Sequence, residues 1–151
     1  FVFDNTHYIH AGAPVLMPVN TDQNKTFDYT IKQWVDQRTL DEVKAQQWEL
    51  IKQSRIAAEY AGFTWDGSKF DSDQLSQQRI TGAVSLAMMS PTFSIGWTLF
   101  DNSVRVLSAT DMMQVGSALG THVATQFAKG VALREQINAA TTTAEIESVV
   151  W

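Results

Sequence analysis

Cysteine is absent from the 151-residue chain. This absence excludes a disulfide framework, a thiolate zinc site and a cysteine nucleophile. The sequence also lacks an apolar run near the ~20 residues that a membrane-spanning helix requires. We therefore expect no membrane partner.

Positive charge is sparse and scattered. Eleven Lys and Arg residues stand against sixteen Asp and Glu, which gives a net charge of −5, and no basic run occurs. A surface that follows nucleic-acid phosphates needs clustered cations. We therefore expect no nucleic-acid partner.

Signatures of catalysis and of cofactor binding are missing as well. No phosphate-binding loop or dinucleotide fingerprint occurs, and the serine of "GSALG" (116–120) comes one position too early for a nucleophile elbow. His7 and His10 have only Asp4 as a nearby acid, which disfavours a metal site. We predict a protein that is not an enzyme and has no catalytic residues, metal or cofactor, with a glycosidase using paired carboxylates as the minor alternative.

The densest group of acids lies in "GFTWDGSKFDSDQLSQQRI" (62–80), which contains Asp66, Asp71 and Asp73. A calcium loop counted from Asp71 fails at three positions, where the chain has Leu75, Ser76 and Gly82. A structural interpretation accounts for each acid. Asp66 belongs to a two-residue hairpin turn, and Asp71 or Asp73 lies at the N-terminus of a helix.

Capping signals and hydrophobic periodicity predict an α+β fold with three main helices, a short C-terminal helix and two β-hairpins. The expected helices are 39–61, 72–89, 108–139 and 142–151, and the expected hairpins are 63–70 and 94–107.

The N-terminal residues 1–38 are predicted to form a short β/loop segment, either an extension or the end of a preceding domain, followed by an α+β domain at 39–151. The strands of the N-terminal segment are expected in "FVF", "PVLMPV" and "FDYTIKQWV". In the third run Phe27, Tyr29 and Ile31 share one face of a single strand. The opening residues do not resemble a signal peptide, and we expect Phe1 to mark a processed or truncated start.

The longest predicted helix is the candidate interface for another chain. Its apolar stripe is Met112, Val115, Leu119, Val123, Phe127, Val131 and Ile137. Glycines lie on or near this face, and each costs ~1 kcal/mol relative to alanine inside a helix, so we expect close packing there. His122 lies beside the stripe and is interpreted as an interior or interface residue. The interface candidates are Gly116, Gly120, His122, Phe127 and Trp151.

Five tryptophans offer two interpretations. Core and interface packing is the first, and a sugar-binding surface that uses Trp65 and Trp97 is the second.

Three separated motifs resemble the DUF4376 domain of phages and prophages: "AGFTWDGSKFDSDQLSQQRITGAV", "FSIGWTLFDNSVRVLSATDMMQVGSAL" and "LREQINAATTTAEIESVVW". "WVDQRTLDEVKAQQWELIK" (34–52) resembles the junction of a β segment and a helix in phage tail and tail-fibre-assembly-like proteins. The resemblance covers roughly 40–151, with a looser match over 27–39.

The resemblance implies a virion component or assembly factor of a tailed phage and supplies no catalytic residues. Its partners would be other tail or fibre proteins, with the chain either a homo-oligomer, a trimer being one form, or bound to a fibre trimer. It would lie in the virion tail, or in the host cytoplasm during assembly. A tail, fibre or baseplate part, an assembly chaperone and a carbohydrate-binding receptor tip remain open.

Overall fold

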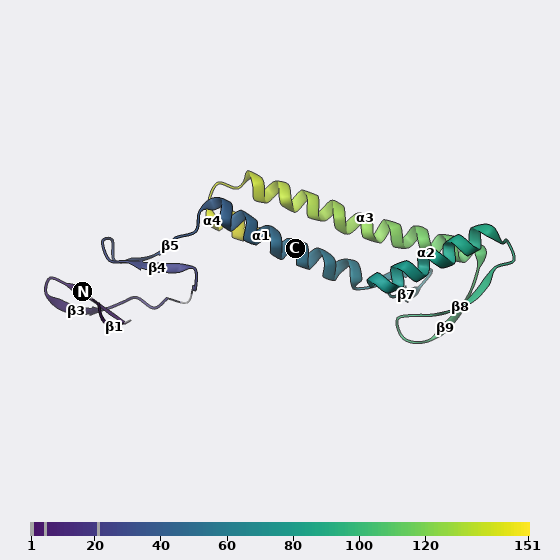
Figure 1. Cartoon of the computed structure of the whole chain (residues 1–151), viewed down its shortest axis with the longest axis horizontal. Helices are drawn as coiled ribbons and strands as arrows, with labels where there is room; N and C mark the ends of the chain where they lie inside the picture. The colour runs from purple at the N-terminus through teal and green to yellow at the C-terminus, as the bar shows by residue number, and fades with distance from the viewer. Residues whose placement is uncertain (1, 5, 21) are drawn as a thin grey trace. The chain divides into compact units, whose positions relative to one another are not determined.

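The computed structural model describes residues 2–4, 6–20 and 22–151, so Phe1 of the first predicted strand lies outside the described residues. The fold is α+β, as predicted, with four helices and nine strands in this described part (Figure 1). Its contacts divide the chain into two compact units, Phe1–Val43 and Lys44–Trp151, which are described separately.

The first unit is built from short antiparallel strands. Strands β1 (Val2–Asp4), β2 (His7–His10) and β3 (Ala13–Leu16) form one sheet in that order, and β4 (Lys25–Asp28) pairs with β5 (Gln33–Asp36). Pro14 therefore lies on an edge strand, where its missing N–H breaks no internal ladder.

The prediction of a single strand across "FDYTIKQWV" is wrong, because the run folds back as a hairpin. Its turn forms where Asp28 Oδ1 accepts a hydrogen bond from Thr30 N at 2.7 Å and Lys32 adopts a φ of 58°. Phe27 pairs with Trp34 across the two strands and is buried, whereas Tyr29 and Ile31 lie exposed in the turn. The local aspartate turn overrides the alternating pattern.

The second unit contains the main helices and two further hairpins. Its helices are α1 (Leu40–Tyr60, which begins in the first unit), α2 (Gln74–Met89), α3 (Ala109–Ala139) and α4 (Thr143–Glu147). Its hairpins are β6 (Phe63–Trp65) with β7 (Ser68–Phe70), and β8 (Ser94–Thr98) with β9 (Val104–Ser108). The last helix is shorter than predicted, since it ends at Glu147 rather than Trp151. None of the described helices is long and apolar enough to cross a membrane.

The predicted helix starts are confirmed by their hydrogen bonds. Ser108 with Asp111, and Thr142 with Glu145, form complete capping boxes. Asp73 is the N-cap of α2, and the hydroxyl and amide of Ser76 donate to its carboxylate, which lowers the pKa of Asp73.

Ser72, which precedes the N-cap residue Asp73, joins α1 to α2. Its hydroxyl donates to Glu59 O at 2.5 Å and accepts from Gly62 N at 2.9 Å, so it satisfies groups at the C-terminal end of α1. Gly62 has a φ of 88°, and a Cβ there would lie 2.8 Å from Phe70 O. Only glycine fits this junction.

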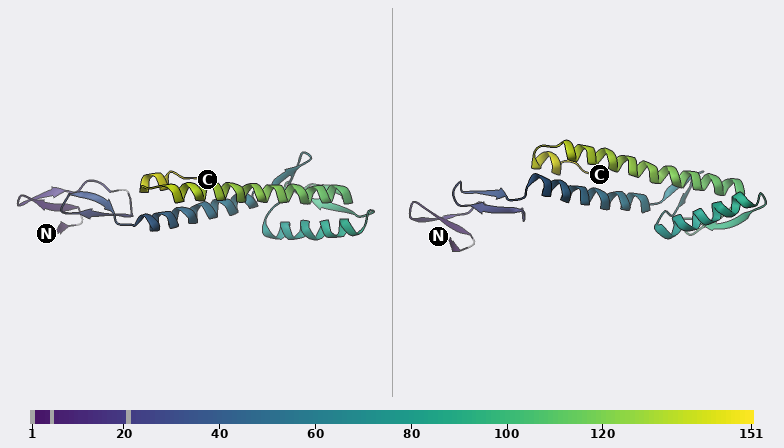
Figure 2. Two further views of the ribbon diagram at one scale, coloured as in Figure 1. Left: turned by 90° about the horizontal axis from the view of Figure 1, so that it is seen from above. Right: turned by 45° about the horizontal axis from the view of Figure 1, so that its top comes forward.

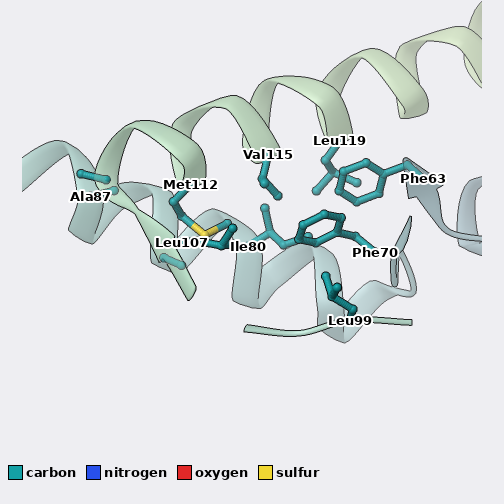
Figure 3. Close-up of a cluster of buried hydrophobic side chains, with 11 residues drawn as sticks. Phe63, Phe70, Ile80, Ala87, Leu99, Leu107, Met112, Val115 and Leu119 are labelled. Carbon is teal, nitrogen blue, oxygen red and sulfur yellow. The ribbon is translucent and has the colours of Figure 1, made fainter. Parts of the chain in front are cut away.

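The hydrophobic core of this unit lies where α2 and the two hairpins pack against the first half of α3 (Figure 3). Its largest fully buried side chains, labelled in the figure, are Phe70, Ile80, Leu107, Met112 and Val115. Their burial accounts for the periodicity of α2 and of the start of α3.

The predicted apolar stripe of α3 is wrong at two positions. Phe127 and Val131 are 46% and 58% exposed, whereas Ile137, further along the same stripe, is buried. Helix α2 accompanies only the first half of α3 (Figure 2). The stripe therefore joins the core where α2 covers it and has exposed positions in the second half of α3.

The packing of α2 on α3 generates a test at Gly116. A Cβ on Gly116 would lie 2.6 Å from Val84 Cγ2, whereas a Cβ on Gly120 would meet nothing within 4 Å. Both Gly→Ala changes gain the same helix propensity, so Gly116→Ala should be about 1–3 kcal/mol less stable than Gly120→Ala in urea unfolding. Equal stabilities would contradict this packing, and Val84→Ala should narrow the difference.

Candidate functional site

Helices α1 and α3 lie side by side in opposite directions within the second unit (Figures 1 and 2). Cationic side chains bridge them. Arg134 Cζ lies 4.9 Å from the ring centre of Trp48, and Arg55 Cζ lies 4.4 Å from that of Phe127. Each such contact contributes about 0.5–2 kcal/mol. We call this boundary the α1–α3 seam.

Arg55 lies at the centre of the α1–α3 seam. Its Nε is 3.2 Å from Glu59 Oε1, and the two side chains are only 19% and 11% exposed. Neither atom has a hydrogen-bond partner in the described part of the chain. The contact is therefore an ion pair whose angle is unsuited to a hydrogen bond. Arg55 Cδ also lies 3.3 Å from the place of a Cβ on Gly130. The missing side chain of Gly130 makes room for the arginine.

Four of the five predicted interface residues lie on α3, and the first three of these differ in their surroundings. Gly116 receives Val84 of α2, so its lack of a side chain is used within the chain. Gly120 is exposed with open space around it, and His122 Nε2 lies 3.1 Å from Glu59 O. The role of these residues in binding another chain stays a prediction.

The other two interface candidates accompany cations. Phe127 is half exposed beneath Arg55. Trp151 is half-buried, with Lys129 Nζ 4.4 Å from its ring centre. Gln47 Nε2 donates to Val149 O at 2.7 Å and so holds the C-terminal segment against α1. Each aromatic ring has one neighbouring cation within the chain, and their role at an interface stays a prediction too.

A groove lies between α2 and β8, with a volume of about 650 Å³, and we call it the α2–β8 groove. Its lining is Asp71, Ser76, Arg79, Gly82, Ala83, Leu86 and the β8 residues Ile95, Gly96, Trp97 and Thr98. Trp97, the second sugar-contact candidate, is half-buried here. The groove combines small residues, apolar side chains and both signs of charge.

A second groove of about 630 Å³ lies between β6 and α3, and we call it the β6–α3 groove. Trp65 lines it together with hydroxyl, amide and imidazole groups of α3, which include Gln114, Thr121 and His122. The Trp65 ring contacts the Arg105 guanidinium, with Cζ 4.9 Å from the ring centre, and the edge of Phe70. The structure therefore puts the two candidate tryptophans, Trp65 and Trp97, in separate grooves.

The acids of "GFTWDGSKFDSDQLSQQRI" have three different surroundings. Asp66 forms a hairpin turn at a φ of 45° and pairs with Arg105, whose guanidinium also donates to Ser68 Oγ at 2.9 Å. Asp73 caps α2, and Asp71 lines the α2–β8 groove. Across the described residues, no three His, Asp or Glu side chains are grouped as metal ligands. The geometry of these acids is that of turn, cap and groove wall.

Sequence reasoning missed the arginines that organise these surfaces. Arg55, Arg79 and Arg105 had no role in the predictions. The partners of Arg55 and Arg105 on other elements, Phe127 and Asp66, are far away in the sequence. No local pattern signals such a pair.

A protein-family model described as "Domain of unknown function (DUF4376)" matches residues 42–150. The chain belongs to this family. The DUF4376 match takes in the α1–α3 seam and both grooves, and strands β1 to β5 lie before it. A search of the curated proteins finds no significant match, and a search of the solved structures finds none.

Substitution of Arg55 tests whether the α1–α3 seam stabilises the DUF4376 domain. Arg55→Ala would leave the Glu59 carboxylate without its counter-charge in a site with little solvent, so the free energy of unfolding should fall by about 2–4 kcal/mol. Adding Glu59→Gln should recover part of the loss, because it removes the uncompensated charge. Urea unfolding followed by circular dichroism measures both variants.

The matched control lies on the same helix. Lys52 pairs with Glu49 in an exposed contact, so Lys52→Ala should change stability by only about 0–1 kcal/mol. An Arg55→Ala loss as small as that of the control would contradict a structural role for the seam.

Proposed function

We propose that the chain is a non-enzymatic component or assembly factor of a tailed phage, acting in the tail, tail fibre or baseplate through protein–protein contacts. The observation that carries the proposal is the exposed apolar surface of the DUF4376 domain. Its exposed side chains include Leu86, Met88 and Met89, which lie at the C-terminal end of α2. Exposed apolar side chains that lie together on one element are typical of surfaces that bind other proteins.

The resemblance of the three sequence motifs to phage and prophage domains supplies the context. The partners would be other tail or fibre proteins, with the chain as a homo-oligomer, of which a trimer is one form, or bound to a fibre trimer. Its location would be the virion tail, or the host cytoplasm during assembly. The net charge of −5 supports protein partners rather than nucleic acid or an anionic membrane.

Mass spectrometry of purified virions, with a deletion of the encoding gene, tests this proposal. A structural part should be present in virions in fixed proportion to the tail proteins. An assembly chaperone should be absent from virions, and its deletion should leave misassembled fibres. A deletion that leaves assembly, adsorption and infectivity unchanged would refute both forms.

The alternative is a carbohydrate-binding receptor tip. Its support is that Trp65 and Trp97 each line a groove and neither is fully buried. Aromatic faces beside hydroxyl and amide groups are suited to sugar rings, which have one apolar face and a polar rim.

A glycan array tests the alternative with the whole chain. Trp97→Ala or Trp65→Ala should abolish binding to a sugar while circular dichroism stays that of the parent chain. Trp48→Phe is the control, because Trp48 lies outside both grooves. Absence of binding to any glycan, or binding that survives both alanine variants, would exclude this function for the two grooves.

A further inference from the structure

The β8–β9 hairpin has an unpaired outer edge in the α2–β8 groove. Among the described strands, only β8 and β9 belong to this sheet. Leu99 N donates to Ser103 O at 2.8 Å, in register with the ladder in which Thr98 lies opposite Val104. Hydrogen-bonded and non-hydrogen-bonded pairs alternate in an antiparallel ladder, so the amide and carbonyl groups of Thr98 and Gly96 point away from β9.

These outward groups have no partner on another element. Within residues 2–4, 6–20 and 22–151, no hydrogen bond joins the outer edge of β8 to α2 or to any loop. Just beyond β8 the same edge is paired, because Phe100 N donates to Lys69 O of β7 at 3.0 Å, so the free edge is confined to Ser94–Thr98. An unpaired strand edge is a template for a further strand, and natural proteins usually block it with charge, proline or a covering element. The sequence of β8, SIGWT, contains none of these blocking residues.

Small residues leave space for a strand beside this edge. Gly82 and Ala83 form the facing wall on α2, and a Cβ on Gly82 would meet nothing within 4 Å. Gly96 on β8 has no side chain either. The resulting groove of about 650 Å³ keeps the backbone of β8 accessible from the side of α2.

The groove walls define the side chains that would fit. Arg79 is exposed and has no ion pair or hydrogen bond within the described residues, so it is available to a carboxylate. Leu86 and Ile95 provide an apolar surface at one end, and Asp71 offers a negative charge at the other. A second copy paired through β8 would bring no acid to Arg79, because SIGWT is uncharged.

We propose that the α2–β8 groove binds an extended segment of a partner protein, which adds a third strand to the hairpin along β8. Main-chain hydrogen bonds to Gly96 and Thr98 would hold the segment, and alternate side chains would enter the groove. The five residues of β8 span ~16 Å at ~3.3 Å per residue, so the segment pairs over about five residues. An acidic side chain would face Arg79, and an apolar one would face Leu86 and Ile95. The inference rests on the proposed role in protein contacts and names the site and the kind of partner.

An array of synthetic heptapeptides of the form Thr-X-Thr-X-Thr-X-Thr tests the proposal, where each X is Val, Glu, Lys or Ser. This set contains both chain directions of every pattern. We expect the full-length chain to select peptides with Glu at the central X and Val at one outer X. Arg79→Glu should shift selection to a central Lys.

Two proline variants distinguish strand addition along β8 from nonspecific binding of peptides. Thr98→Pro removes an outward amide without breaking the β8–β9 ladder and should weaken binding of the selected peptides by about tenfold or more. Val104→Pro makes the same change on the opposite edge of the hairpin and should leave their affinity unchanged. Gly82→Leu should fill the groove and abolish binding. Circular dichroism and thermal unfolding establish that all three variants fold.

Several results would overturn the inference. These are no selected peptide, affinity that is insensitive to Thr98→Pro and Gly82→Leu, or a dimer of this chain that Thr98→Pro dissolves. Glycan binding that Gly82→Leu abolishes, without peptide binding, would assign the groove to sugars. None of these results alters the detection of the chain in virions, so failure of the groove and failure of the proposed function are distinguishable.

Discussion

The close approach of α2 and α3 at Gly116 is the constraint on which the DUF4376 domain depends. Val84 occupies the space that a side chain at Gly116 would fill, and the neighbouring core forms around this contact. Both hairpins then complete the core, with Phe70 from β7 and Leu107 from β9 fully buried. Close-packed interiors tolerate little change in volume, so this contact limits what α2 and α3 can vary.

The α1–α3 seam follows a different principle from this core. Where α2 no longer accompanies α3, arginines lying over aromatic rings join α3 to α1, and the Arg55–Glu59 pair lies nearly out of solvent. These polar contacts add specific geometry to the apolar burial of Ile51 on α1 and Ile137 on α3, since buried ions themselves contribute little net stability. Ser72 and Gly62 complete the arrangement where α1 turns toward the hairpin.

The same arrangement leaves functional groups unused on the surface. Each hairpin packs one face on the core and uses one edge of each strand for pairing within the hairpin. The outer edge of β8, Arg79 and the exposed apolar side chains of α2 remain accessible to a partner. A domain that buries its core with two-stranded sheets retains more free backbone edge than one with a larger sheet. The free backbone edge of the two-stranded β8–β9 sheet therefore connects the fold to the proposed role in binding other proteins.

The sequence by itself determined the order of the four helices and of the two hairpins between them, the caps at Ser108 and Thr142, and the turn at Asp66, because each depends on residues within a few positions. It misjudged Tyr29 and Ile31, where a local aspartate turn overrode an alternating pattern, and it misjudged Phe127 and Val131, where periodicity does not reveal which element lies opposite. Only the tertiary structure decided that Gly116 receives Val84, that Arg55 lies over Phe127 and that β8 keeps a free edge beside α2. These features join positions far apart in the chain, and a single sequence carries no signal of which distant residues meet.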